Sequence, residues 1–331
     1  MDSGRRACRR SVRITQVTTR ADLPDGLGSA FTVREAGRQG VTRGRLTASD
    51  LDSPLRGIRV TSSATDLDRC AALLRSLPEG AFVMGRSAAA LQGLPVRPGA
   101  DVQVGVPAGT RAPRRAGVRA RAIAISPEDV IRFRGFVAMT SPVRTWLDLA
   151  AGVALDELVA VGDSMIRPPD ELSSPGEFAA VVQRYPRAHG SRLARRAIPL
   201  LSPAAESYAE SQLRVLLHLA GFPPPVVNPV VRDGGRFVAR VDLMFREYGV
   251  VVEYEGSHHG TDLAQWRRDM SRIGSIQALG YIVERAHADD LRDPVPLLTR
   301  LAAHLTARGW TGRWSVPSDW SLRRGWVRGQ A

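Results

Sequence analysis

The feature that most restricts the fold of this 331-residue chain is a pair of apolar segments with acidic residues near their ends. The pattern predicts a strand, a turn and a second strand, at residues 237–245, 246–249 and 250–255. With a four-residue turn, Phe245 faces Val250, and Asp242 therefore faces Glu253. The two-residue period of a strand places Glu255 on the same face as Glu253. Three carboxylates are thus predicted to converge, in a register that a slip of one residue would destroy.

Carboxylates this close raise each other's pKa values, so the arrangement is costly unless a cation neutralises it. Their hard oxygen ligands suit Mg²⁺ (or Mn²⁺), which keeps several waters, polarises a phosphodiester and generates a hydroxide for in-line attack. We therefore predict metal ligands and catalytic groups at Asp242, Glu253 and Glu255. In the alternative interpretation, some of these acids pair with neighbouring arginines such as Arg240 or Arg285.

Further candidate groups follow the second strand. His258 and His259 lie between glycines and could transfer a proton or bind a phosphate oxygen. Residues 262–279 are predicted to form a helix whose apolar stripe faces the core, followed by a third strand at 281–285, a turn at Asp289 and Asp290 and a closing helix at 296–307. Arginines off the stripe and on the third strand are either solvated surface or a phosphate clamp: Arg267, Arg268, Arg272 and Arg285.

The charge of the chain indicates a polyanionic partner. All 46 basic residues are arginine, against 33 acidic residues, which gives a net charge of +13. Guanidinium groups bind phosphate bidentately and stack on bases, so nucleic acid is the favoured partner and an arginine-rich solvated surface the alternative. Because the chain has no lysine, a mechanism that requires one is closed to it.

The N-terminal part resembles a winged helix-turn-helix in its order of elements. Thr32 and Glu35 have capping-box spacing in a predicted helix that ends at Gly40. Thr42 is then predicted to cap a second helix over 43–49, and residues 54–61 a β wing. The second helix would present two candidate phosphate-binding residues, Arg43 and Arg45. A small helical cap on a larger domain is the alternative interpretation.

Composition shifts divide the chain into six predicted parts. They are a basic extension at 1–29, a winged helix-turn-helix at 30–62, a middle α/β module at 63–167, a helical linker at 168–201, an α/β domain at 202–307 and a tail at 308–331. Within the middle module, the sequence predicts strands near 101–106, 118–125 and 136–140 and helices near 144–151 and 155–166. The fold class is α/β, or α+β overall. The four tryptophans of the tail either stack on single-stranded bases or pack on their own domain.

Other features bear on the compartment. No apolar run approaches the ~18 residues that cross a bilayer, and residues 1–13 lack the apolar core of a secretion signal. Cys8 and Cys70 have no ligand-like spacing. We therefore expect a cytoplasmic protein with no membrane partner.

Several motifs of the C-terminal part occur in the order of a known family. They are 207–214 (SYAESQLR), 240–243 (RVDL), 252–256 (VEYEG), His259, Asp269, Arg272 and 280–285 (GYIVER). Together they resemble the domain of unknown function 559, a family similar to the very-short-patch-repair endonucleases of the PD-(D/E)XK nuclease superfamily. The resemblance implies a restriction-endonuclease-like α/β/α sandwich, metal ligands at Asp242, Glu253 and Glu255, and an accessory acid at Glu210.

One departure from that superfamily concerns Glu255, which stands where a lysine is usual. The repair endonucleases use histidine, so His258 or His259 could substitute. A second, looser resemblance covers about 31–151 and rests on the predicted winged helix, residues 85–93 (GRSAAALQG) and residues 140–149 (TSPVRTWLDL). These segments resemble AbiEi-type antitoxins of type IV toxin-antitoxin systems, whose role is transcriptional autoregulation. The sequence therefore predicts a DNA-binding, Mg²⁺-dependent endonuclease for DNA repair or defence. Its alternatives are a DNA-binding regulator or antitoxin with an inactive nuclease fold, with a cognate toxin or a homodimer as partners, and an RNA-processing nuclease that shares the site.

Overall fold

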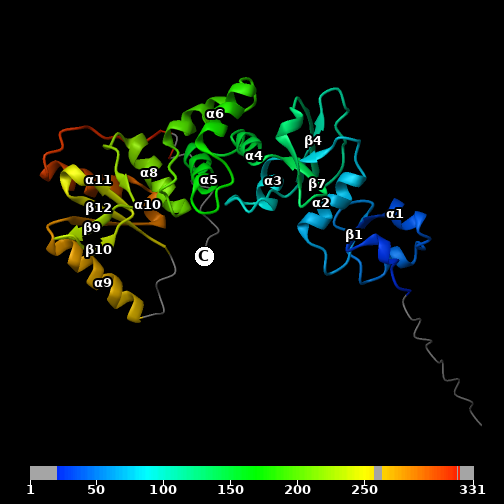
Figure 1. Cartoon of the computed structure of the whole chain (residues 1–331), viewed down its shortest axis with the longest axis horizontal. Helices are drawn as coiled ribbons and strands as arrows, with labels where there is room; N and C mark the ends of the chain where they lie inside the picture. The colour runs from blue at the N-terminus through cyan, green and yellow to red at the C-terminus, as the bar shows by residue number, and fades with distance from the viewer. Residues whose placement is uncertain (1–20, 257–262, 319, 321–331) are drawn as a thin grey trace, which may run out of the picture. The chain divides into compact units, whose positions relative to one another are not determined.

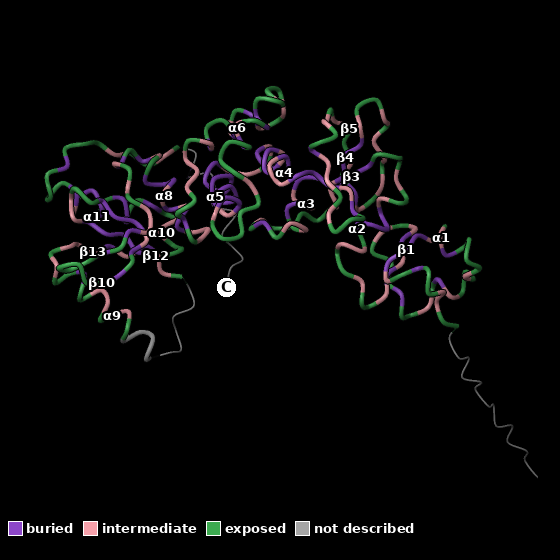
Figure 2. The backbone as a smooth tube through the Cα atoms, in the orientation of Figure 1, coloured by how far each residue is buried: buried purple, intermediate pink, exposed green. Residues whose placement is uncertain are grey.

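The computed structural model describes residues 21–256, 263–318 and 320; of 263–267 it describes the backbone alone. The chain divides into two compact units, residues 1–77 and 78–331 (Figure 1). Helices and sheets alternate in both, so the fold class is mixed α and β, as the sequence predicted. Figure 2 shows that burial is concentrated in the strands and in the inner faces of the helices.

The first unit is a small sheet with short helices. Its elements are η1 (Asp25–Leu27), β1 (Ala30–Thr32), α1 (Val33–Arg38), η2 (Arg45–Thr47), β2 (Ile58–Val60) and α2 (Asp66–Arg75). β1 pairs antiparallel with β2. The predicted capping box is confirmed, since Thr32 Oγ1 accepts the backbone N–H of Glu35 and Glu35 accepts that of Thr32. Phe31 and Ala36 are fully buried in the core of this unit.

The prediction of an α-helix over 43–49 is wrong. Thr42 does accept the backbone N–H of Arg45, but only the single 3₁₀ turn η2 follows. The reason is local: Gly44 stands at its start and Ala48 leaves it in an extended conformation. Around the predicted wing at 54–61, Asp52 forms an antiparallel bridge with Val60, which closes a hairpin over the intervening residues.

The second unit begins with a five-stranded sheet in the order β5-β4-β3-β7-β6. Its elements are β3 (Phe82–Val83), α3 (Gly85–Leu91), β4 (Val102–Pro107), β5 (Val118–Ile123), η3 (Pro127–Asp129), β6 (Val130–Phe133) and β7 (Val137–Thr140). The strands predicted near 101–106, 118–125 and 136–140 are confirmed as β4, β5 and β7, whereas β3 and β6 were not predicted. β3 has only two residues, which is too short for a periodic signal.

A helical layer follows the sheet. It consists of α4 (Pro142–Leu149), α5 (Leu155–Ile166), α6 (Pro175–Arg184), α7 (Ser191–Ala197) and η4 (Ile198–Leu200). Trp146 is fully buried at its centre, where it meets Phe178 edge to face at 4.7 Å and donates to the carbonyl of Leu158 at 2.8 Å. The predicted helix 155–166 is confirmed residue for residue. α5 also packs on α8, the first helix of the C-terminal part.

The C-terminal part carries a four-stranded mixed sheet in the order β13-β12-β11-β8 and a separate β10-β9 pair. Its elements are α8 (Tyr208–Ala220), β8 (Val226–Val227), β9 (Val230–Asp233), β10 (Arg236–Arg240), β11 (Leu243–Phe245), η5 (Arg246–Tyr248), β12 (Val250–Glu255), α9 (Leu263–Ala278), β13 (Ile282–His287), α10 (Ala288–Arg292) and α11 (Val295–Ala307). The turn predicted at Asp289 and Asp290 is instead the start of α10.

The predicted single strand over 237–245 is wrong, because the chain leaves one sheet and enters another within it. β10 pairs with β9, β11 pairs with β8 and β12, and Val241 and Asp242 lie between. The predicted register of the second hairpin is confirmed: Phe245 pairs with Val250, and Leu243 with Val252.

Helices cover both faces of the four-stranded sheet (Figure 1). Val250 and Val252 of β12 pack with α8 and α11, whereas Val251 packs with Ile276 of α9. Successive residues of a strand point to opposite faces, so Glu253 and Glu255 share the α9 face with Val251.

The beginning of the tail packs on its own domain, as one of its two interpretations predicted. Trp310 stacks on Phe222 at 5.2 Å, and Trp320 donates its indole N–H to the carbonyl of Leu291 at 2.8 Å. Trp314 stacks on Phe222 from 6.2 Å, and Trp326 lies outside the described residues.

Candidate functional site

Asp242 lies where the chain passes from β10 to β11, at the edge of the α9 face. Its Oδ2 accepts the backbone N–H of Tyr254 at 2.7 Å, which ties it to the acidic end of β12. Burial raises the pKa of Asp242, and the repulsion of Glu210 adds to this, although the bond from Tyr254 lowers it. The predicted cross-strand pair of Asp242 with Glu253 is not formed, because β11 begins at Leu243. The side chain of Asp242 nevertheless reaches the acidic end of β12 through Tyr254.

Glu253 is the most deeply buried carboxylate of the predicted set, with 5% of the residue exposed. Burial raises its pKa to about 7, and repulsion by Asp242 contributes to the rise. Arg272 of α9 opposes it by donating to Oε1 of Glu253 at 3.0 Å. Arg272 thus only partly offsets the repulsion between Asp242 and Glu253, which share a poorly hydrated space.

Glu210 joins the same electrostatic group from α8. It is buried, and its Oε2 accepts the backbone N–H of Glu206 at 3.0 Å and the side-chain amide of Asn228 at 2.9 Å. Asn228 also donates its backbone N–H to the carbonyl of Asp242 at 2.8 Å. It has a positive φ of 49°, a conformation that asparagine tolerates better than most residues. Asn228 therefore links two acids of the site, and nothing in the sequence pattern identified it.

Glu255 has partners of its own on β13. It forms an ion pair with Arg285, and Nδ1 of His287 lies 3.6 Å from its Oε2. The parallel register explains both contacts, because Glu253 is aligned with Arg285 and Glu255 with His287. The predicted alternative, in which an acid pairs with Arg285, thus describes Glu255. Arg240 also pairs with an acid, but this acid is Glu206, which precedes α8.

The fit of a divalent cation rests on the chemistry of these donors. Among the residues that the structure describes, no group of three or more His, Cys, Asp or Glu side chains is arranged to hold a metal ion. Mg²⁺ commonly binds through one or two carboxylates and retains waters, so it does not require such a group. Asp242 and Glu253 supply two hard oxygen donors whose mutual repulsion a cation would relieve. The donor set therefore fits Mg²⁺ or Mn²⁺.

The remaining predicted site residues are two histidines after β12 and the arginines of α9 and β13. His258 and His259 lie outside the described residues, as does the side chain of Arg267. Arg268 is exposed on α9. Arg272 and Arg285 form ion pairs with Glu253 and Glu255.

The two arginines predicted to bind phosphate in the first unit have different environments. Arg43 is exposed. Arg45 forms a bidentate pair with Asp50, at 2.9 and 2.8 Å, and donates to the carbonyl of Ala21 at 2.5 Å. With 9% of its side chain exposed, Arg45 holds its own loop together.

In the described part of the chain, no helix combines the length and the apolar character needed to span a bilayer. The chain matches no protein-family model. It is similar to two uncharacterized proteins of Mycobacterium tuberculosis, MT2308 and Rv2248, each 29% identical over 167 residues that cover 50% of this chain and 61% of the relative. The match therefore spans less than two thirds of those relatives. The crystal structure of the Rv2827c protein of the same organism covers 56% of this chain and 75% of its own, with 17% identity and a TM-score of 0.37.

Proposed function

We propose that the chain is a DNA-binding protein whose C-terminal part is a Mg²⁺-dependent endonuclease with a PD-(D/E)XK-type sandwich. The observation that carries this proposal is the pair formed by the partly buried Asp242 and the buried Glu253, whose pKa values are both raised. A protein seldom places two repelling carboxylates together at the end of an apolar strand without a function for them. The excess of arginine supports a phosphodiester substrate.

In this proposal, the acidic residues bind the metal ion and the arginines bind the phosphate. Asp242, held by the N–H of Tyr254, and Glu253 would hold the metal, with Glu255 as a third ligand once Arg285 turns to a phosphate. When bound, the ion supplies Lewis-acid polarisation of the phosphodiester and an activated water. Arg272 and Arg285 are close enough to exchange their carboxylate partners for phosphate oxygens, which they would bind in the same geometry. Glu210 is the accessory acid that orients Asn228.

In the same proposal the first unit is a winged helix-turn-helix that binds DNA through exposed arginines such as Arg43. Its support is the order of α1, the turn η2 and the hairpin closed by Asp52 and Val60. This part would position the nuclease on duplex DNA. An RNA substrate would be cleaved by the same carboxylates, so nuclease assays with DNA and with RNA distinguish the two substrates.

The proposal is tested by calorimetric titration of Mg²⁺ and Mn²⁺ into the protein and by plasmid nicking on the same samples. We expect metal binding and nicking in the parent and the loss of both in the Asp242→Asn variant. An exposed acid of the same hairpin, Glu247, provides the matched Glu247→Gln control, which keeps both. A parent that binds no metal, or an Asp242→Asn protein that cuts as well as the parent, contradicts the proposal.

A second function is favoured by the arginine partners of the acids. Glu253 is paired with Arg272 and Glu255 with Arg285, so each carboxylate is already neutralised in part without a metal. The chain would then be a DNA-binding transcriptional regulator or antitoxin, in which the nuclease-type fold is an inactive binding platform for DNA, a second copy or a toxin. DNA binding that is salt-sensitive and survives EDTA, together with no nicking, would favour this function over the first.

A further inference from the structure

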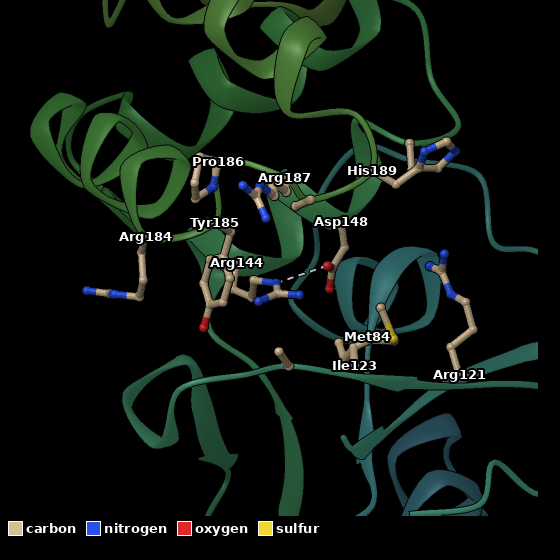
Figure 3. A pocket seen from close by; sticks show the side chains of 13 residues that line it. Met84, Arg121, Ile123, Arg144, Asp148, Arg184, Tyr185, Pro186, Arg187 and His189 are labelled. Atoms are coloured by element: carbon tan, nitrogen blue, oxygen red, sulfur yellow. Dashed lines mark hydrogen bonds and ion pairs between the residues drawn. The ribbon is translucent and has the colours of Figure 1, made fainter. Parts of the chain in front are cut away.

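The second unit contains a cavity of about 580 Å³ that shares no residue with the acidic site. It is lined from four places in the chain: the end of β3, the strand β5, one face of α4 and the segment 184–189 (Figure 3). A smaller cavity of about 260 Å³ adjoins it, because both are lined by Arg121, Asp148 and His189. Sites for small organic ligands have volumes of this order, roughly 300 to 1,000 Å³.

The walls of the larger cavity combine cations with apolar side chains. Arg121 of β5 and Arg187 are exposed and line it, and the charge of Arg121 also acts on the carboxylate of Asp148 in the same wall. Met84, Ile123 and Pro186 supply apolar surface between them. Such a lining suits a ligand with an anionic group and an apolar body, because exposed guanidinium groups bind phosphate bidentately.

A buried arginine gives the cavity a polar group that the fold does not satisfy. Only 5% of the Arg144 side chain is exposed, and Nε donates to Oδ1 of Asp148 at 3.0 Å. Its guanidinium lies over the ring of Tyr185, 4.1 Å from the centroid, on the cavity wall (Figure 3). Within the described residues, Nη1 of Arg144 has no hydrogen-bond partner. Buried donors are normally paired, so an acceptor from outside the chain is expected here.

We propose that this cavity binds a mononucleotide. Arg121 and Arg187 bind its phosphate, the apolar wall contacts its sugar and base, and Nη1 of Arg144 donates to an oxygen or nitrogen of the base. Inorganic phosphate alone would fill a small part of the volume and would leave the apolar wall in water. A ligand that fills the space satisfies the buried donor and the exposed cations together.

The test is calorimetric titration of the full chain with inorganic phosphate, with each of the ribonucleoside 5′-monophosphates and with the corresponding nucleosides. We expect at least one monophosphate to bind, and its nucleoside and inorganic phosphate to bind at least about tenfold more weakly. Arg121→Gln and Arg187→Gln should each weaken binding several-fold. Arg132→Gln, an exposed arginine of β6 in the same sheet, is the matched control and should leave it unchanged.

Arg144→Met tests the buried donor, and unfolding experiments show whether this variant folds. If it does not, the two surface variants still decide the question. The proposal is overturned if no monophosphate binds at millimolar concentration, if inorganic phosphate binds as tightly as every monophosphate, or if Arg121→Gln and Arg187→Gln bind as well as Arg132→Gln. A 5′-phosphorylated single-stranded oligonucleotide could also bind more tightly than any mononucleotide. This result would mean that the cavity binds the 5′ end of a strand, and it would overturn the proposal of a mononucleotide site.

Discussion

The backbone N–H of Tyr254 donates to Oδ2 of Asp242 across 2.7 Å, and this bond joins the residue that precedes β11 to the acidic end of β12. The bond has two opposing effects on the stability of the folded protein. It stabilises the fold by pairing the N–H of Tyr254 and holding Asp242 in place. It also keeps a negative charge next to Glu253, and the repulsion between the two carboxylates raises the pKa of Glu253.

These two effects separate in a pair of variants. Asp242→Asn keeps an acceptor for Tyr254 and removes the charge, whereas Asp242→Ala also leaves that N–H unpaired. We expect Asp242→Ala to be less stable than Asp242→Asn by roughly 1 to 3 kcal/mol in denaturant unfolding. In both variants the pKa of Glu253 should fall, because the repelling carboxylate is gone. Equal stability of the two variants would mean that the bond contributes nothing.

The raised pKa of Glu253 predicts how stability depends on pH. Since its pKa is about 7 in the folded chain and 4.5 is the ordinary value, the folded state binds the proton more tightly. The resulting stabilisation is complete below pH 4.5 and is lost as the pH rises through 7. Relative to Glu253→Gln, the wild-type free energy of unfolding should therefore fall by up to roughly 3 kcal/mol over this window. The measurement is denaturant unfolding across the pH range, with Glu247→Gln as the exposed control.

Gly190 is expected to tolerate no side chain. Its φ is 88°, and an added Cβ would lie 2.4 Å from the backbone carbon of Ala150. Gly135, with a φ of 82°, has no atom within 4 Å of the same position. Both alanine variants carry the strain of the left-handed conformation, about 1 to 2 kcal/mol. Gly190→Ala should lose roughly a further 1 to 3 kcal/mol from overpacking. Similar melting temperatures for the two variants would contradict the close approach of α7 to Ala150.

Arg43 and Arg45 should respond differently to alanine. Arg43→Ala is expected to weaken DNA binding and to reduce the slope of log K against log salt by about one phosphate contact, with little change in stability. Arg45→Ala removes the bidentate pair with Asp50 and should lower the free energy of unfolding by about 1 kcal/mol. Arg69→Ala, which removes an exposed ion pair with Asp66, is the control. If Arg43→Ala binds DNA as tightly as this control at every salt concentration, the proposed contact of the first unit with DNA is contradicted.

Features that depend on neighbouring residues were predictable. The helix 155–166, the strand 250–255 and the capping box of Thr32 and Glu35 all follow the sequence pattern. The register of Phe245 against Val250 was also predictable, because the length of the turn between two strands sets it. The prediction failed where the helical pattern was weak. After Thr42, Gly44 stands at the start of the helix and Ala48 is already extended, so the helix is limited to one turn.

Local pattern thus accounts for elements such as β12 and for the alternation that puts Glu253 and Glu255 on one of its faces. The change of sheets at Asp242 depends on long-range packing, because the choice between β9 and β8 as partner is made by segments outside the hairpin. Long-range packing also brings Arg272 to Glu253, Arg285 to Glu255 and Arg144 to a cavity wall. These contacts, and the burial that raises the pKa of Glu253, join residues far apart along the chain, and local periodicity carries no information about such distances.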